Sequence, residues 1–205
     1  MSQRHVHVVE DEDAIRRSLR MMLRVMGYEP HAHVSGAAFL DALPHLPAGC
    51  ALLDIRMPEI DGLEVQRRLG AVGSDQPIVM MSGHGDLAIA AAVMEQGAVA
   101  FLEKPFSRAT LELALHIAFL RIEDADGYDR YLEDAAAAVR HLDAADRQVL
   151  NLMARGLDAD SIAQQTGLSR VVIEVARSRI FAGLGTDSIT EVLRIAVAAE
   201  RADAS

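Results

Sequence analysis

The chain has 205 residues, of which 51% are hydrophobic and 24% are charged, enough apolar material for one or two folded domains. Its formal net charge of -10 argues against a generally basic nucleic-acid binder, although a local basic face can exist within an acidic total. The single cysteine, Cys50, excludes an intrachain disulfide and a thiolate zinc site. Because no leader-like or eighteen-residue apolar run occurs, we expect a cytoplasmic protein without a membrane span.

Short apolar runs typical of strands alternate with segments of helical spacing in the first part of the chain. The expected strands cover residues 5–9, 51–53, 78–81 and 99–102, with a weaker run near residues 28–34. The helical segments between and after them begin near residues 15, 36, 63, 87 and 110. This alternation predicts a doubly wound α/β domain, in which ligands bind outside the carboxyl ends of five parallel strands.

Polar side chains follow these expected strands. Glu10 and Asp11 come after the first strand, Asp54 after the third, Ser82 after the fourth and Lys104 after the fifth. Clustered carboxylates repel one another and are held together most readily by a hard divalent cation such as Mg²⁺. Each acid alone could instead cap the next helix, but the agreement of four strand ends favours a metal site.

Lys104 is the only lysine among twenty basic residues, the other nineteen being arginine. A compact ammonium on a flexible stem approaches a small anion differently from a planar guanidinium. We interpret Lys104 as the partner of a small anion, with a composition bias that left one lysine as the alternative.

Several segments resemble a known family: VHVVEDED, LLDIRMPEIDGLEV, MSGHGD, GAVAFLEKPF and a second block near the C-terminus. The chain is similar to the two-component response regulators of the FixJ/NarL type. This resemblance implies a receiver domain of flavodoxin-like strand order, in which Asp54 accepts a phosphoryl group from a sensor histidine kinase. It also implies that the protein is not an enzyme, apart from assisting its own phosphoryl transfer and dephosphorylation.

The resemblance further assigns roles at this edge of the sheet. The implied ligands of Mg²⁺ are Glu10, Asp11, Asp54 and the backbone carbonyl of Arg56. Lys104 would balance the charge of the phosphoryl oxygens, and Ser82 would donate its hydroxyl to them.

A switch and two further features are implied in the same way. Ser82 would move inward and let Phe101 rotate behind it, although a phenylalanine on a strand is more often plain core. The Lys104–Pro105 peptide is a candidate for the cis form. Arg56 and His84 occupy positions that tune phosphoryl lifetime in the family.

The expected organisation is a receiver domain at residues 1–121, a helical linker at 122–141 and an output domain at 142–205. Leu111, Leu115 and Ala118 suit packing in a core. Residues 135–139 could belong to a core or pair with a partner chain, and the sequence does not separate these alternatives.

The output domain reads as four short helices. The expected N-caps are Asp143, Asp158 or Asp160, Ser169, and Asp187 or Ser188, while Gly156 and Gly167 end the first two helices. The block resembles a LuxR-type helix-turn-helix, in which residues 160–166 form the scaffold and residues 169–181 enter the major groove of DNA.

On the expected recognition helix, Ile173, Ala176 and Ile180 would face the core. The candidate DNA contacts are Arg170, Arg177 and Arg179 to phosphates and Glu174 with Ser178 to base edges, with Val175 beside them. The family commonly has threonine, histidine and lysine where this chain has Val172, Ala176 and Gly183. Residues 143–205 hold nine acids and seven arginines, so this region is about -2 instead of basic.

Two functions stay open from the sequence. In the first, phosphorylation drives homodimerisation through residues 87–102, and paired output domains bind promoter DNA, with RNA polymerase as a further partner. In the second, a receiver carries a degenerate helix-turn-helix that binds protein. An unrelated phosphatase or phosphotransferase is a third and more distant reading.

Overall fold

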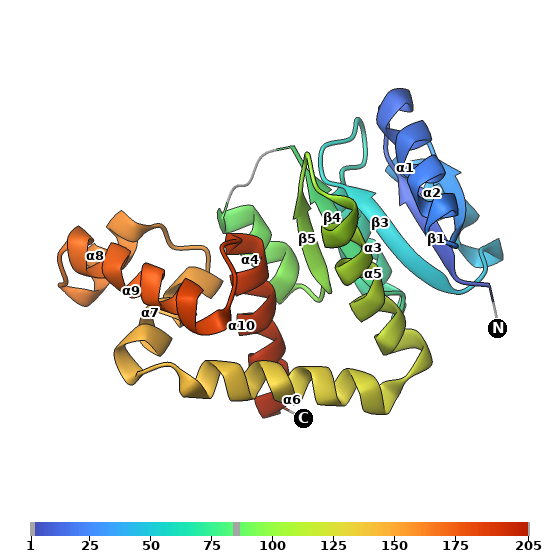
Figure 1. Ribbon diagram of the computed structural model, residues 1–205. Helices are drawn as coiled ribbons and strands as arrows, with labels where there is room; N and C mark the ends of the chain where they lie inside the picture. Colours follow the sequence, from blue (N-terminus) through green and yellow to red (C-terminus); the bar gives the residue numbers. More distant parts are fainter. Residues whose placement is uncertain (1–2, 84–86, 205) are drawn as a thin grey trace. The chain divides into compact units, whose positions relative to one another are not determined.

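The computed structural model describes residues 3–83 and 87–204. The chain folds into two compact units, Met1–His84 with Gln96–Ala125, and Gly85–Glu95 with Asp126–Ser205 (Figure 1). Within the described residues, no helix is both long and apolar enough to cross a membrane. The predicted boundaries at residues 121 and 141 stay predictions.

The first unit is built on a five-stranded sheet of order β2-β1-β3-β4-β5 in which all neighbouring strands are parallel. The strands are β1 (His5–Val9), β2 (Glu29–His33), β3 (Gly49–Asp54), β4 (Ile78–Ser82) and β5 (Ala100–Glu103). Every residue of β3 is buried, as expected for a central strand that is covered on both faces and therefore has a continuous apolar sequence. The predicted doubly wound fold is confirmed.

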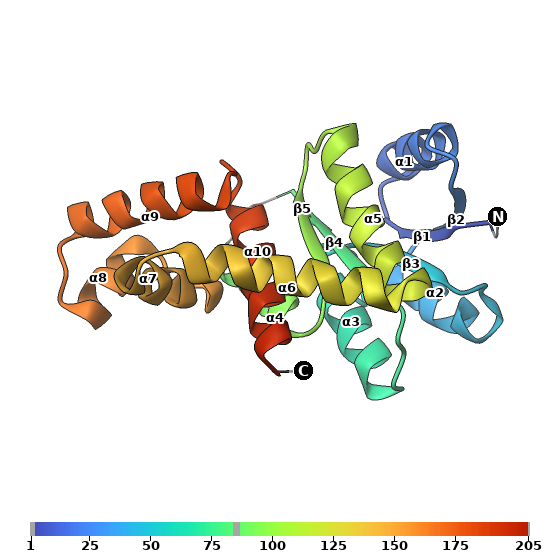
Figure 2. The same ribbon diagram turned by 60° about the horizontal axis from the view of Figure 1, so that its bottom comes forward.

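Helices cover both faces of this sheet. Their bounds are α1 (Asp13–Val25), α2 (Gly36–Ala42), the short 3₁₀ helix η1 (Leu43–His45), α3 (Gly62–Ala71) and α5 (Arg108–Glu123). Figure 2 shows α1 and α5 on one face and α2 and α3 on the other. Leu111, Leu115 and Ala118 of α5 are fully buried, which confirms that they belong to the core.

The second unit is helical. It contains α4 (Leu87–Glu95), α6 (Ala125–His141), α7 (Ala144–Ala154), α8 (Ala159–Thr166), α9 (Arg170–Leu184) and α10 (Ile189–Ala204). Asp143, Asp158 and Ser169 cap α7, α8 and α9 with side-chain oxygens, as predicted. Gly156 and Gly167 follow α7 and α8 with positive φ, so the predicted helix ends are also confirmed.

Helix α6 occupies the segment predicted as a linker. Its Leu132 and Ala135 form a buried cluster with Ala198 of α10, and Tyr128 and Tyr131 pack against that cluster. Ala135 is therefore covered by the chain's own α10 in this structure, which favours the core alternative at that position.

Candidate functional site

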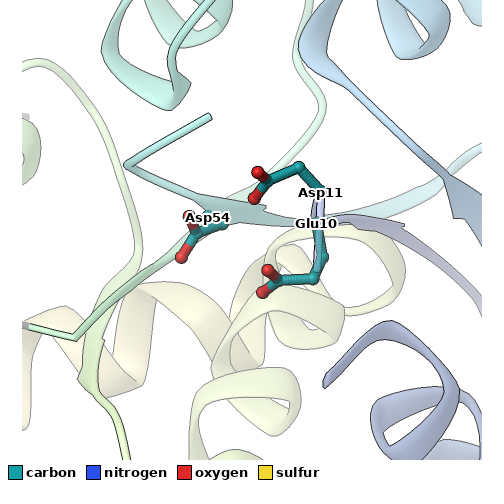
Figure 3. A group of neighbouring side chains, drawn as sticks. All are labelled: Glu10, Asp11 and Asp54. Atoms are coloured by element: carbon teal, nitrogen blue, oxygen red, sulfur yellow. The ribbon is translucent and has the colours of Figure 1, made fainter. Parts of the chain in front are cut away.

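Three carboxylates lie together at the carboxyl edge of the sheet. Glu10 and Asp11 directly follow β1, and Asp54 is the last residue of the neighbouring strand β3. One oxygen from each residue lies within 4.8 Å of the other two, and no other such group of three metal-ligating side chains occurs within the described residues (Figure 3). Glu10 and Asp54 are buried and Asp11 is exposed, so the group borders solvent on one side. These oxygens could hold a hard metal ion.

Lys104 joins two of these carboxylates across the sheet. Its Nζ lies 2.6 Å from Glu10 Oε2 and 2.5 Å from Asp54 Oδ1. The backbone N–H of Lys104 donates to the carbonyl of Ser82 over 2.7 Å, which fixes the start of the loop after β5. The Lys104–Pro105 peptide is cis, as predicted. The structure thus places the only lysine of the chain where an anion at Asp54 would meet it.

The charges at this site shift one another's protonation. Burial raises the pKa of Glu10 above its ordinary value, the ammonium of Lys104 opposes that shift, and the nearby Asp54 charge adds to it. Burial by itself lowers the pKa of Lys104, but the hydrogen bonds that its ammonium donates to Asp54 and Glu10 outweigh this effect, so the pKa is raised. Lys104 therefore stays charged at neutral pH and compensates the crowded carboxylates.

The loop after Asp54 returns to pack directly beneath this residue. Gly62 donates its N–H to the Ile55 carbonyl over 2.9 Å, and a Cβ at Gly62 would lie 2.3 Å from the Asp54 carbonyl oxygen. The side chain of Asp61 accepts a hydrogen bond from the N–H of Glu64 and caps α3. The Asp-Gly pair after the strand therefore both starts the helix and permits the close approach that holds Asp54 in place.

The remaining predicted residues of this site lie at two strand ends and a loop. Ser82 ends β4 and is buried in register with Glu103, while Phe101 is buried on β5 opposite Met80. Arg56 is exposed just after β3. His84 lies outside the described residues, so its predicted position is not tested.

A helix-turn-helix in the second unit presents the candidate DNA-contacting surface. Gly167, with φ 73°, follows the last residue of α8, and Ser169 caps α9. The predicted inner face of α9 is confirmed, since Ile173, Ala176 and Ile180 are buried. The exposed face borders a shallow surface depression lined by Arg170, Val171, Glu174, Val175 and Ser178.

Val171 was not among the predicted contact residues, although 72% of its surface is exposed. Its place four residues before Val175 on a surface helix could have indicated it, because an apolar residue at helical spacing on the solvent side has no core to join.

Each predicted phosphate-contacting arginine on α9 has an acidic partner in the same unit. Arg170 lies 3.0 Å from Asp160, and Arg177 lies 3.4 Å from Glu174. Arg179 binds Asp146 of α7 through both Nε and a terminal nitrogen, at 2.8 and 2.5 Å. Asp146 is buried, so this bidentate pair ties α9 to α7, a structural role that the sequence did not indicate.

The comparisons with known proteins agree with this arrangement. Residues 6–116 match the family described as response regulator receiver domain, and residues 142–196 match the bacterial regulatory proteins of the luxR family. The chain is 37% identical to the transcriptional regulatory protein FixJ of Bradyrhizobium diazoefficiens over 95% of each chain, and 34% identical to FixJ of Rhizobium meliloti over 97% of each. The chain is a two-component response regulator.

A solved structure supports the same assignment. Full-length FixJ from B. japonicum has 36% sequence identity and a TM-score of 0.58 to this response regulator, covering 98% of this chain and 99% of that chain. The response regulator therefore combines a receiver domain with a luxR-type DNA-binding domain and regulates transcription. These domains suggest a histidine kinase and DNA as its partners, and the similar curated proteins are regulators, not enzymes.

Proposed function

We propose that Asp54 is the residue that accepts the phosphoryl group, and that its phosphorylation controls dimerisation and promoter binding. The observation that carries this proposal is the hydrogen bond from Lys104 to an acid at the end of the central strand. In the order β1-β3-β4-β5, Asp54 lies between the acids that follow β1 and the hydroxyl of Ser82 that ends β4. A phosphoryl group on Asp54 is thereby flanked by a cation and a hydroxyl donor.

The donor set fits Mg²⁺, since three carboxylates can present oxygens within 4.8 Å of one another. The residues that would hold it are Glu10, Asp11, Asp54 and the backbone carbonyl of Arg56. When bound, Mg²⁺ supplies positive charge that offsets the charge of the phosphoryl oxygens.

The chain's own residues supply positioning. One carboxylate oxygen of Asp54 attacks phosphorus in line while the bond from phosphorus to the histidine nitrogen of the kinase breaks. Lys104 already contacts Asp54, so a small movement of its ammonium would bring it to a phosphoryl oxygen. Ser82 would donate its hydroxyl to another phosphoryl oxygen. Movement of Ser82 would then change the packing around Phe101. The same residues would assist dephosphorylation, in which a water oxygen attacks phosphorus while the bond from phosphorus to the Asp54 oxygen breaks.

Labelling with a small phosphodonor in the presence of Mg²⁺ tests the assignment. Asp54→Asn should abolish incorporation. Asp61→Asn is the matched control, because it changes an acid of the same loop while asparagine still caps a helix, and it should label like the parent chain. Comparable labelling of Asp54→Asn and the parent chain would sink the assignment.

Phosphorylation of the receiver can alter DNA binding only if it changes the conformation of the protein or the partner that the protein binds. We infer that it converts monomers to dimers through residues 87–102. Within the second unit, α4 packs against α10 and α7, and Arg201 donates to the Met94 carbonyl over 2.9 Å. This packing already covers part of α4, so dimerisation there requires α10 to give way.

Light scattering before and after treatment with a phosphoryl mimic should show a doubled mass at constant protein concentration. Paired output domains would then fit half-sites about one helical turn of DNA apart, and RNA polymerase is a further partner at such promoters. An unchanged mass after confirmed phosphorylation would contradict the dimer proposal.

A further inference from the structure

Two His-x-His segments lie side by side on the first two strands and have no part in the proposed phosphorylation. They are His5-Val6-His7 on β1 and His31-Ala32-His33 on β2, and the parallel register places His7 opposite His31. Because side chains alternate along a strand, each pair shares a face of the sheet. Ring centroids are 5.1 Å apart for His5 and His31, 5.2 Å for His7 and His31, and 5.9 Å for His7 and His33. Four imidazoles therefore form one continuous cluster.

The tautomer of His7 follows from its neighbours. Its Nε2 lies 2.9 Å from the carbonyl oxygen of Pro47, and since a carbonyl can only accept, Nε2 carries the hydrogen. The other ring nitrogen, Nδ1, is then a bare lone pair, and it is buried without a hydrogen-bond partner in the described structure. Metal-ligating histidines commonly show this arrangement, with one nitrogen donating to a carbonyl and the other bound to the metal.

His5 and His31 already bring two nitrogens together. His5 Nδ1 lies 3.0 Å from His31 Nε2, and both rings are only half-buried. Two nitrogens on a tetrahedral zinc ion at bond lengths of about 2.05 Å would be about 3.3 Å apart, so only a small opening of the pair is needed. A shift of the donor's hydrogen to its other ring nitrogen would free both lone pairs without losing a proton.

A third metal ligand does not yet lie in position beside the nitrogens of His5 and His31. Among the described residues, the acid cluster at Asp54 is the only group whose three ligand atoms lie within 4.8 Å of one another. The histidine cluster thus offers two convergent nitrogens. The remaining ligands of a bound metal must be water, or His7 after its ring rotates toward the pair.

The charge state suits a metal. Burial lowers the pKa of His7 to about 4, with the neighbouring histidines adding to the effect, and burial also lowers the pKa of His31 and His33. Imidazole binds metals in its neutral form, which burial favours for His7 and His31. Glu29, in register with His5, supplies a nearby negative charge.

We propose that His5 and His31, with His7 behind them, form a binding site for a borderline divalent transition metal such as Zn²⁺ or Ni²⁺. Imidazole nitrogens suit these ions, whereas Mg²⁺ prefers the oxygens of the acid cluster. Because the ligands come from two strands, the metal would clamp the edge strand β2 to β1.

Calorimetric titration of the tag-free full chain with NiCl₂ or ZnCl₂, in excess Mg²⁺ to occupy the acid cluster, tests the proposal. The parent chain should bind metal and melt at a higher temperature with it. His31→Gln and His5→Gln should each weaken binding at least about tenfold, the lower limit for loss of even an outer partner. The exposed His116 of α5 gives the matched control, and His116→Gln should bind like the parent.

The proposed metal site would be wrong if the parent chain did not bind the metal, or if His31→Gln and His116→Gln bound it equally. Loss of binding in Asp54→Asn would also contradict the site, because it would assign the metal to the acid cluster. Melting curves without metal show whether His31→Gln is folded, and His5→Gln provides the second variant if it is not.

Discussion

Lys104 Nζ lies 2.5 Å from Asp54 Oδ1, so the only lysine of the chain is hydrogen-bonded to the acid at the end of its central strand. The same ammonium also binds Glu10, and both carboxylates are buried. A buried carboxylate without a compensating charge is costly. The arrangement is therefore stable only while a cation, from the chain or from solution, is present among the acids.

This dependence predicts the effect of removing Lys104. Lys104→Met should lower the free energy of unfolding by about 3 kcal/mol, the range for breaking a buried ion pair, and Mg²⁺ should restore part of it by replacing the lost charge. Arg67→Met, which breaks an exposed pair with Glu64, should cost less than about 1 kcal/mol. Urea unfolding with and without Mg²⁺ measures both, and a Lys104→Met loss no larger than that of Arg67→Met would contradict the argument.

Gly62 gives a second prediction, because a Cβ there would lie 2.3 Å from the Asp54 carbonyl oxygen. Gly62→Ala should destabilise the first unit by about 1–3 kcal/mol, as overpacking does, and slow labelling of Asp54 by displacing the strand end. Gly70→Ala is the control in the same helix. With nothing within 4 Å of its Cβ, it should stabilise the protein by about 0.5–1 kcal/mol.

His7 predicts a pH dependence of stability. Its folded pKa is about 4, whereas an unfolded histidine titrates near 6.5, so the unfolded chain binds more protons between these values. Its contribution is present above pH 6.5 and is lost as the pH falls toward 4, on the order of 3 kcal/mol in total. The rings of His31 and His33 lie beside it, and burial lowers their pKa as well, so they contribute in the same direction.

Urea unfolding at several pH values, without transition metals, checks this. His7→Gln should flatten the dependence between pH 6.5 and 4, and His116→Gln should leave it unchanged. Equal slopes for His7→Gln and the parent chain would show that His7 does not cause the effect.

Much of the receiver fold was predictable because its strands are continuous apolar runs and the polar residues come where those runs end. The parallel order then required Glu10, Asp54 and Lys104 to meet at one edge. The hydrogen-bond partners of single side chains were harder to predict, since the sequence contains no signal that Lys104 binds Glu10 as well as Asp54. That choice depends on how the side chains extend across β1, β3 and β5.

In the output helices, too, some features were predictable from the sequence and others were not. The caps at Asp143 and Ser169 and the buried face of α9 followed from local patterns. The Arg179–Asp146 pair did not, because it joins residues 33 positions apart on different helices. An arginine bound to a phosphate and one bound to a buried carboxylate look identical in sequence.

The pairing of arginines on α9 decides how this acidic domain should bind DNA. Arg170 and Arg177 have exposed acidic partners that phosphate can displace, whereas Arg179 is held by buried Asp146. Arg177→Ala should weaken binding to all sequences about equally and reduce the salt slope by about 0.9, the value for one phosphate contact. Arg155→Ala, at the end of α7, is the control and should leave both the affinity and the salt slope unchanged.

The acidic residue beside Arg177 should behave in the opposite way. Glu174 is exposed on the face of α9 that we expect to enter the groove, and it costs affinity near phosphates unless it accepts a hydrogen bond from a cytosine amino group. Glu174→Ala should therefore relax the preference at one base pair while it holds or raises non-specific affinity. Binding of each variant to specific and scrambled duplexes at several salt concentrations measures both effects. If Arg177→Ala and Glu174→Ala leave affinity and specificity unchanged, α9 does not lie in the groove, and a protein partner becomes the better explanation of its exposed face.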